Sequence, residues 1–247
     1  MLTRQQSERF ARHIMLDELG EAGQERLLGC SVLVIGAGGL GSPVVLYLAA
    51  AGVGTIGIAD SDCVELSNLQ RQIVHHTPDI GRPKVQSAAE KMTALNPDVT
   101  VVPFHERVLP DTIAGIMAGF DFVIDATDNF EAKFMINDAC VRAGKPYSHG
   151  GILRFDGQTM TVLPGRSACY RCIFPEEPDA EAAVACSRAG VMGVLPGVIG
   201  TIQATEAIKC MLGIGELLTN RLLTYNVLRM AFREIFVRRN PSCPVCS

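Results

Sequence analysis

The sequence of 247 residues predicts an α/β fold with a doubly wound, mainly parallel sheet and an antiparallel C-terminal extension. Three observations support this prediction. Short apolar runs alternate with helical segments from residue 31 to residue 149, as in a parallel sheet with crossover helices. A glycine-rich turn, GAGGLG at 36–41, joins the first apolar run to the first of these helices. Beyond Gly150, hairpin patterns replace the alternation and indicate antiparallel strands.

The elements of the first part follow from apolar periodicity and from turn residues. Residues 3–19 have an amphipathic helical pattern, and Gly20 is expected to end that helix. Pro83 suits the first turn of a later helix that begins near Arg82. Strands are expected at 31–35, 55–59, 99–102, 121–125 and 146–149, and helices at 42–52, 82–95 and 130–143.

The second part is expected to contain two hairpins and one long helix. Asp156-Gly157 is a strong turn signal between the apolar runs 152–155 and 158–163. A long apolar helix is expected at 198–212, and residues 222–237 indicate a closing hairpin. The chain is therefore expected to form one domain over residues 1–247, with N-terminal helices in 1–29.

Composition and charge exclude several classes of partner. The net charge of −4 gives no general attraction to nucleic acid or to an anionic membrane. Residues 27–59 carry no charge, but glycines and Pro43 interrupt them, so a buried strand, turn, helix and strand are expected rather than a membrane span. Nine cysteines without a secretory signal predict a reducing, cytoplasmic location and metal or catalytic use of thiols.

Two CxxC pairs predict a metal site. Cys169 and Cys172 form one pair, and Cys243 and Cys246 form the other. Two such pairs complete a tetrahedral site of four thiolates, for which zinc is the first choice. An iron–sulfur cluster or redox dithiols are the alternatives. A closed site of four cysteines leaves no open position for catalysis, so its expected role is to tie the C-terminal tail to the loop after the hairpin.

The residues around the glycine turn predict a nucleotide site. Glycines allow a tight turn that brings backbone N–H groups and a helix N-terminus close to a phosphate. Asp60 ends the next apolar run, where a carboxylate accepts hydrogen bonds from a ribose. Arg71 and Lys84 follow soon after, and two phosphate-binding cations favour ATP chemistry over hydride transfer.

Acidic residues near the predicted strand ends are candidate metal ligands. Asp128 follows the apolar run 121–125, at the edge where open α/β sheets bind ligands, and a carboxylate beside a triphosphate usually coordinates Mg²⁺. The alternative is that Asp128 caps the next helix. Asp62 is either a second acidic ligand or a turn residue.

The chain resembles the MoeB/ThiF family, the bacterial E1-like adenylyltransferases. The matching motifs cover nearly the whole chain: GAGGLG at 36–41, Asp60, SNLQRQ at 67–72, Arg-Pro-Lys84, Ala-Thr-Asp128-Asn129, both CxxC pairs, and GVIGTIQATEAIK at 197–209. The resemblance implies a Rossmann-like fold, a homodimer, zinc, and ATP-dependent adenylation of the C-terminal glycine of a small ubiquitin-like sulfur carrier. It also implies a nucleotide-binding half at 30–150 and a carrier-binding and zinc half at 151–247.

The resemblance implies roles for individual residues. Arg12 matches an arginine that the partner subunit supplies to the phosphates, although His13 stands where the family usually has Gln. Cys186 matches a loop cysteine that takes the activated carboxyl or forms a persulfide linkage, and Arg188 favours its thiolate. An ordinary packed thiol is the alternative. The implied nucleotide site comprises Gly36, Gly38, Gly39, Gly41, Asp60, Asp62, Ser67, Asn68, Leu69, Gln70, Arg71, Lys84, Asp128 and Asn129, of which Arg71, Lys84 and Asp128 are also assigned to catalysis.

Two rival functions are weighed against adenylation. An NAD-dependent oxidoreductase on the same framework leaves Arg71, Lys84 and Asp128 without a role. A zinc-stabilised binding protein that only senses nucleotide or carrier is the other rival. The carrier belongs to the thiamine or the molybdopterin pathway, with a slight preference for molybdopterin from residues 189–192 and 239–243. No rhodanese-like segment follows Ser247, so the sulfur is expected from another protein such as a cysteine desulfurase.

Overall fold

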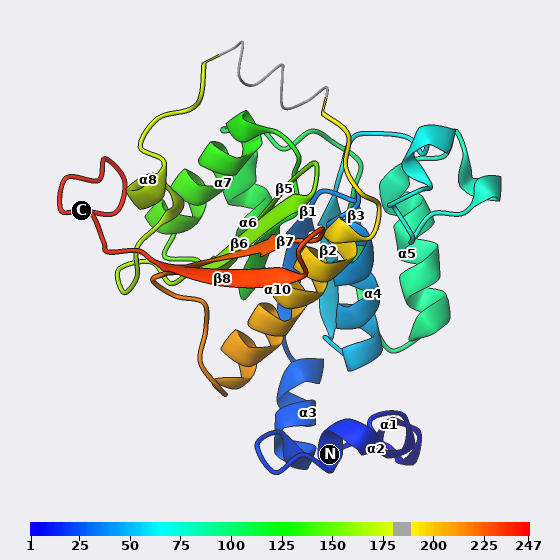
Figure 1. Cartoon of the computed structure of the whole chain (residues 1–247). Helices are drawn as coiled ribbons and strands as arrows, with labels where there is room; N and C mark the ends of the chain where they lie inside the picture. Colours follow the sequence, from blue (N-terminus) through cyan, green and yellow to red (C-terminus); the bar gives the residue numbers. More distant parts are fainter. Residues whose placement is uncertain (180–188) are drawn as a thin grey trace.

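The computed structural model describes residues 1–179 and 189–247, and its strands form one eight-stranded sheet (Figure 1). The strand order is β3-β2-β1-β4-β5-β6-β7-β8. The strands are β1 Ser31–Ile35, β2 Thr55–Ala59, β3 Thr100–Phe104, β4 Phe122–Asp125, β5 Tyr147–Leu153, β6 Asp156–Val162, β7 Arg221–Asn226 and β8 Ala231–Phe236. The helices are α1 Arg4–Arg9, α2 Ala11–Ile14, α3 Gly20–Leu28, α4 Gly41–Ala51, α5 Lys84–Leu95, α6 Ile113–Met117, α7 Phe130–Arg142, α8 Tyr170–Ile173 and α10 Leu195–Leu212.

The sheet changes from parallel to antiparallel at β5. Strands β3, β2, β1, β4 and β5 pair in parallel, whereas β5 with β6, β6 with β7, and β7 with β8 pair antiparallel. The parallel order reverses direction between β1 and β4, which is the point where doubly wound sheets bind ligands. The predicted Rossmann-like fold with an antiparallel extension is confirmed.

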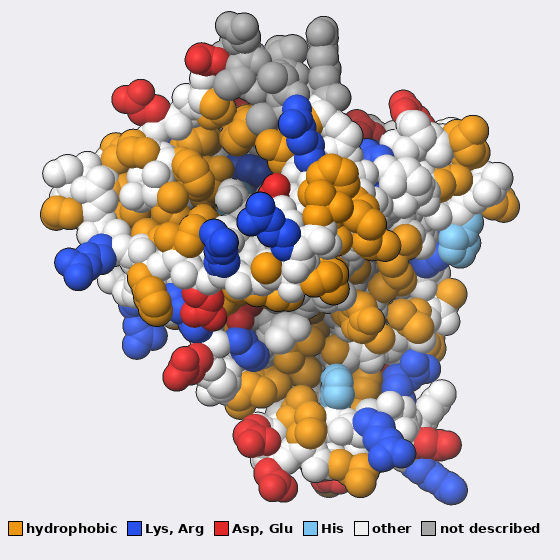
Figure 2. Space-filling view, viewed as in Figure 1, with side chains coloured by type: hydrophobic (Ala, Val, Ile, Leu, Met, Phe, Trp, Pro, Cys, Tyr) orange, Lys and Arg blue, Asp and Glu red, His pale blue; other side chains and the backbone are white. Residues whose placement is uncertain are grey.

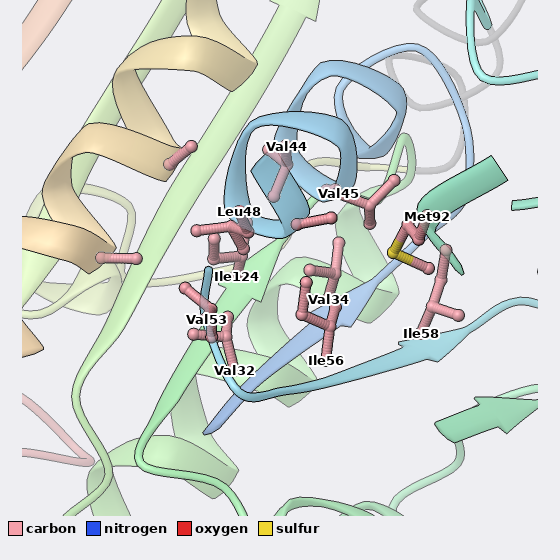
Figure 3. Packing of buried hydrophobic residues seen from close by; sticks show 14 of the residues in the cluster. Val32, Val34, Val44, Val45, Leu48, Val53, Ile56, Ile58, Met92 and Ile124 are labelled. Carbon is pink, nitrogen blue, oxygen red and sulfur yellow. The ribbon is translucent and has the colours of Figure 1, made fainter. Parts of the chain in front are cut away.

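Helices cover both faces of the sheet, and each face has its own apolar core. Successive residues of β1 point to opposite faces: Val32 and Val34 belong to one core, Leu33 and Ile35 to the other. Figure 3 shows the first core: α4 lies over β1, β2 and β4, and its Leu48 packs among the buried side chains of these strands. This packing fixes the loops at the carboxyl ends of the strands.

The N-terminal helix differs from its expected form. Instead of one helix over 3–19, α1 and α2 are two short helices, and Gly20 begins α3 rather than ending a helix. Phe10 stands at the break and is buried, and a Cβ on Gly52 would lie 2.5 Å from its ring. Burial of this aromatic side chain against α4 therefore overrides the local helical pattern.

The first hairpin also differs from its expected form. Strand β5 continues without a break from its parallel partner into the hairpin, and the turn lies at Arg154 and Phe155. Arg154 has a positive φ of 54°. Asp156 and Gly157, expected to form the turn, begin β6, and Gly157 packs so closely that a Cβ would lie 2.5 Å from Ile199. Glycine here serves packing against α10 instead of a turn.

Two short helices, α6 and α8, had no sequence signal that predicted them. Within the described residues, no helix is long and apolar enough to cross a membrane.

Candidate functional site

A cavity of about 330 Å³ opens at the carboxyl ends of β1, β2 and β4, at the switch point of the sheet. This volume is within the usual range for a site that binds a small molecule. The cavity is lined by Ile35, Gly36, Gly38, Gly39, Leu40, 59–62, Arg71, Gln72, Lys84, 106–110, 126–129, Glu131, Ala132, Met135 and Ile152.

The glycine turn is shaped by steric necessity. Gly36 has a φ of +107°, which L side chains rarely adopt, and a Cβ there would lie 2.6 Å from the Ala126 carbonyl oxygen. A Cβ on Gly41 would lie 2.0 Å from the Gly36 carbonyl oxygen. Gly41 therefore closes the turn against its own start and begins α4, although it does not line the cavity.

Hydrogen bonds brace the turn from two sides. The Ala37 amide donates to Asp60 Oδ2 at 2.8 Å, and the Asp62 amide donates to Asp60 Oδ1 at 2.8 Å. On the other side His75 Nε2 lies 2.9 Å from the Ala37 carbonyl oxygen, and its Nδ1 lies 2.9 Å from Ser87 Oγ. Burial is the main cause that lowers the pKa of His75, so the neutral ring donates to this carbonyl. The turn is thus held open by neighbours before any ligand binds.

Two cations line the same cavity. Lys84 begins α5, its side chain is only 7% exposed, and its Nζ lies 2.8 Å from Asp62 Oδ2. Arg71 is partly buried, and its Nη1 donates to the Ser67 carbonyl at 3.3 Å. A buried ammonium and a guanidinium beside a helix N-terminus form a site for a polyanion such as a triphosphate.

Asp128 enters the cavity as an exposed side chain after β4. The capping oxygen of α7 belongs to Asn129, whose Oδ1 accepts the Ala132 amide at 2.9 Å. The helix therefore has its cap without Asp128, and the Asp128 carboxylate remains available to a ligand or a metal ion.

The structure brings together only part of the expected nucleotide site. Asn68 turns inward and is 8% exposed, and its Oδ1 accepts the Glu65 amide at 3.1 Å, so it shapes its own turn. Gln70 packs against Gly193, where a Cβ would meet its carbonyl oxygen at 2.3 Å. Of the expected residues, Gly36, Gly38, Gly39, Asp60, Asp62, Arg71, Lys84, Asp128 and Asn129 line the cavity, whereas Gly41, Ser67, Asn68, Leu69 and Gln70 do not.

Arg12 and Cys186 are not part of this cavity as described. Arg12 is an exposed residue of α2, and Figure 1 shows α1 and α2 beyond α3, away from the carboxyl ends of the strands. Cys186 lies outside the described residues.

Sequence reasoning missed a buried ionic cluster behind the cavity. Asp125 ends β4, and its Oδ2 lies 3.3 Å from Lys133 Nζ and 2.9 Å from His149 Nδ1. Burial raises the pKa of Asp125, but Lys133 and His149 outweigh burial and lower it to about 2. Burial is the main cause that lowers the pKa of His149. The signal that pointed here was Asp125 itself, at the ligand-binding end of a buried strand.

Sequence reasoning also missed the loop 106–110, which follows β3 and forms a wall of the cavity. From this loop, Arg107 Nη2 lies 3.0 Å from Oε2 of Glu131 in α7, and both residues line the cavity. No sequence motif indicated this loop, because its residues are far in sequence from the glycine turn and only the folded sheet brings them to the cavity.

The four cysteines of the CxxC pairs form one cluster. All four sulfur atoms lie within 4.8 Å of one another. Cys169 Sγ is 3.6 Å from Cys243 Sγ, and Cys172 Sγ is 3.4 Å from Cys246 Sγ. Sulfur atoms that bind zinc at about 2.3 Å in a tetrahedron are about 3.8 Å apart, so the donor set fits zinc. Cys169 is the N-cap of the single turn of α8 and Cys172 lies within that turn, whereas the second pair belongs to the C-terminal tail.

Comparisons with known proteins agree with this architecture. The SAMP-activating enzyme E1 of Haloferax volcanii is 50% identical over 241 residues, which are 98% of this chain and 89% of that protein. The sulfur carrier protein adenylyltransferase of Thermus thermophilus is 46% identical over 99% of this chain and 92% of its own length. The structure of E. coli MccB aligns with a TM-score of 0.86 at 22% identity, covers 100% of this chain and 74% of its own, and supports the fold. The ThiF family model matches residues 10–245, and the chain therefore belongs to the ThiF family.

Proposed function

We propose that this chain is an ATP-dependent adenylyltransferase that activates the C-terminal glycine carboxylate of a small ubiquitin-like sulfur carrier protein. The observation that supports it best is one cavity that combines a glycine turn, a helix N-terminus, Lys84, Arg71 and Asp128. An NAD-dependent oxidoreductase needs the first two features and has no use for the other three. The names of the two relatives above agree with the proposal.

The reaction is a displacement at phosphorus. A carboxylate oxygen of the carrier attacks the α-phosphorus of ATP, and pyrophosphate leaves. Lys84 and Arg71 offset the negative charge on the phosphates, while the backbone amides of the glycine turn fix their position. Asp128 would hold Mg²⁺, which would supply further charge neutralisation on the phosphate oxygens. Asp60 is suited to the ribose hydroxyls, because each carboxylate oxygen has a lone pair beyond its backbone bond.

The antiparallel half is the proposed carrier-binding surface. On the face shown in Figure 2, hydrophobic side chains gather around a hollow in front of β5 and the start of α10. Contiguous apolar surface of this kind is typical of a protein-binding site. Among the described residues, the exposed large apolar side chains of this half are Leu153, Phe155, Met192, Val194, Leu228, Met230, Phe232, Ile235 and Phe236.

Four further features belong to the proposal. The enzyme acts as a homodimer in which Arg12 of one subunit reaches the phosphates of the other, which agrees with its position outside the cavity of its own chain. Zinc at the cysteine cluster fastens the C-terminal tail. Of the two candidate carriers, the molybdopterin-synthase small subunit is preferred to the thiamine sulfur carrier. The sulfur comes from a separate donor, such as a cysteine desulfurase, in the cytoplasm.

Pyrophosphate exchange tests the activity. Purified protein with Mg²⁺, ATP and a diglycine-ended carrier should move label from pyrophosphate into ATP, and removal of the terminal glycine should abolish it. Asp128→Ala should lower the rate by about 100-fold or more, as for other lost transition-state charges. Asp111→Ala, an exposed carboxylate outside the cavity, is the matched control. No carrier-dependent exchange, or near-normal exchange in a folded Asp128→Ala protein, would contradict the proposal.

A further inference from the structure

Lys133 is a buried lysine of α7 that links the end of β4 to the middle of β5. It is 7% exposed. Its Nζ donates to the Thr127 carbonyl at 2.7 Å, just after β4, and to the Gly150 carbonyl at 2.5 Å, within β5. An ammonium group has three donors, and the third direction points to Asp125 at 3.3 Å. Every donor of this buried cation therefore has an acceptor on the sheet side of the cavity.

Asp125 completes the cluster from the strand side. Its Oδ1 accepts both the amide and the hydroxyl of Thr127, at 3.0 Å and 2.6 Å. The amide, the hydroxyl and the carbonyl of Thr127 are thus all bound by one ion pair. A single residue tied at three groups has little freedom to change its backbone angles.

The next residue contrasts with this arrangement. Asp128 is exposed, and the described residues provide no hydrogen bond or ion pair to its carboxylate. The direction in which this carboxylate enters the cavity is therefore set by the backbone before it, at Thr127, and by the cap after it, at Asn129. Asn129 fixes the start of α7, and the Lys133–Asp125 pair fixes the backbone of Thr127 between β4 and Asp128.

We infer that Lys133, through its pair with Asp125, is a positioning residue that fixes the Asp128 carboxylate for Mg²⁺. This inference rests on the proposed function. A buried ion pair adds little to stability over an apolar pair of similar volume, because desolvation offsets the attraction. Its geometric effect on Thr127 is the property that an apolar pair does not reproduce.

The test removes the pair without leaving one buried charge alone. Lys133→Met combined with Asp125→Asn keeps the volume and the charge balance. The half-saturating Mg²⁺ concentration in pyrophosphate exchange should rise about 5-fold, the equivalent of roughly one lost hydrogen bond. Lys133→Arg, which keeps the charge and two or more donors, should show a smaller rise than the double variant.

Lys145→Met is the matched control. Lys145 also donates from a partly buried position to a backbone carbonyl, that of Phe120, but at the amino ends of the same two strands. It should leave the Mg²⁺ dependence within about 2-fold of the wild type, since no bond near Asp128 is lost. An equal Mg²⁺ shift in this control and in the double variant would assign the effect to general loosening and overturn the inference.

A second measurement does not depend on activity. Amide hydrogen exchange of a peptide covering 126–129 should speed up about 10-fold in the double variant and stay unchanged in Lys145→Met. The Thr127 amide donates to Asp125 Oδ1, and the neutral amide oxygen of Asn accepts more weakly than this carboxylate. The double variant also loses the bond from Lys133 to the Thr127 carbonyl. Unchanged protection of this segment overturns the inference even if the wild type shows no pyrophosphate exchange. If the wild type shows no pyrophosphate exchange but the double variant has altered amide protection at 126–129, only the proposed function is rejected.

Discussion

Close packing of α10 on α4 makes two glycines of one helix respond oppositely to the same substitution. A Cβ at Gly200 would lie 2.5 Å from the Leu40 carbonyl oxygen and 2.7 Å from Pro43 Cγ. Around Gly197, one turn earlier in the helix, nothing lies within 4 Å of the added atom. The pair therefore compares a close helix contact with open space in the same helix.

The magnitudes follow from these distances. At Gly200 the two helices must separate by about 0.9 Å to reach ordinary contact, and overpacking of this kind costs about 1–3 kcal/mol. At Gly197 alanine only improves the helical preference, by about 0.5–1 kcal/mol. In a chain of this size 1 kcal/mol shifts the melting temperature by about 2–4 °C. Gly200→Ala should therefore lower it by about 2–12 °C, and Gly197→Ala should raise it by about 1–4 °C.

Differential scanning fluorimetry of the wild type and both variants, at one protein concentration and without nucleotide, measures these shifts. Because Leu40 also lines the cavity proposed for ATP, Gly200→Ala should weaken ATP binding as well, which isothermal titration calorimetry detects. Equal melting temperatures for the two variants would refute the reasoning, because the two positions differ in that an added Cβ meets α4 at Gly200 and open space at Gly197.

Three further predictions concern the dimer, the metal site and the stability of the fold at acidic pH. Mixed dimers of Arg12→Ala with Asp128→Ala should recover partial pyrophosphate exchange, because one hybrid site is intact; no recovery in demonstrated mixed dimers means that Arg12 acts within its own subunit. Elemental analysis should find zinc in the wild type and a loss of zinc in Cys243→Ser, and full retention of zinc in this variant would exclude the residue as a ligand. The pKa of Asp125 lies at about 2, below its ordinary 3.8, so its stabilisation is complete above about pH 4 and disappears as the pH falls through 2. Asp125→Asn should flatten the decrease in unfolding free energy over this interval in acid titrations, and an unaltered slope contradicts the assigned pKa.

The parallel half of the fold was predictable from local pattern. The bounds of β1 and β2 match their expected ranges, 31–35 and 55–59, because each is a short apolar run next to glycine. The family followed from motifs spread over nearly the whole chain, and the type of fold followed from the alternation of strands and helices; both are confirmed. Local pattern was sufficient here because the strands are buried on both faces and leave little choice of register.

The errors arose where distant residues decide the structure. Phe10 breaks the N-terminal helix because it packs on α4, and Gly157 leaves the expected turn because it packs on α10. Neither contact has a signature in the neighbouring residues. The same holds for Lys133: a lysine on a helix is usually solvated, and only the fold buries it against Asp125.

Strand β5 has parallel and antiparallel neighbours on its two sides, and this gives it a mechanical role. Its first residues pair with β4, whereas its later residues pair with β6 alone and include Ile152, which lines the cavity. A loop absorbs movement by changing its backbone angles, but a strand bonded along its length passes a displacement to its far end. Because β5 is paired with β6 along residues 147–153, a displacement of the antiparallel edge is passed along this strand to the cavity at the carboxyl ends of the parallel strands.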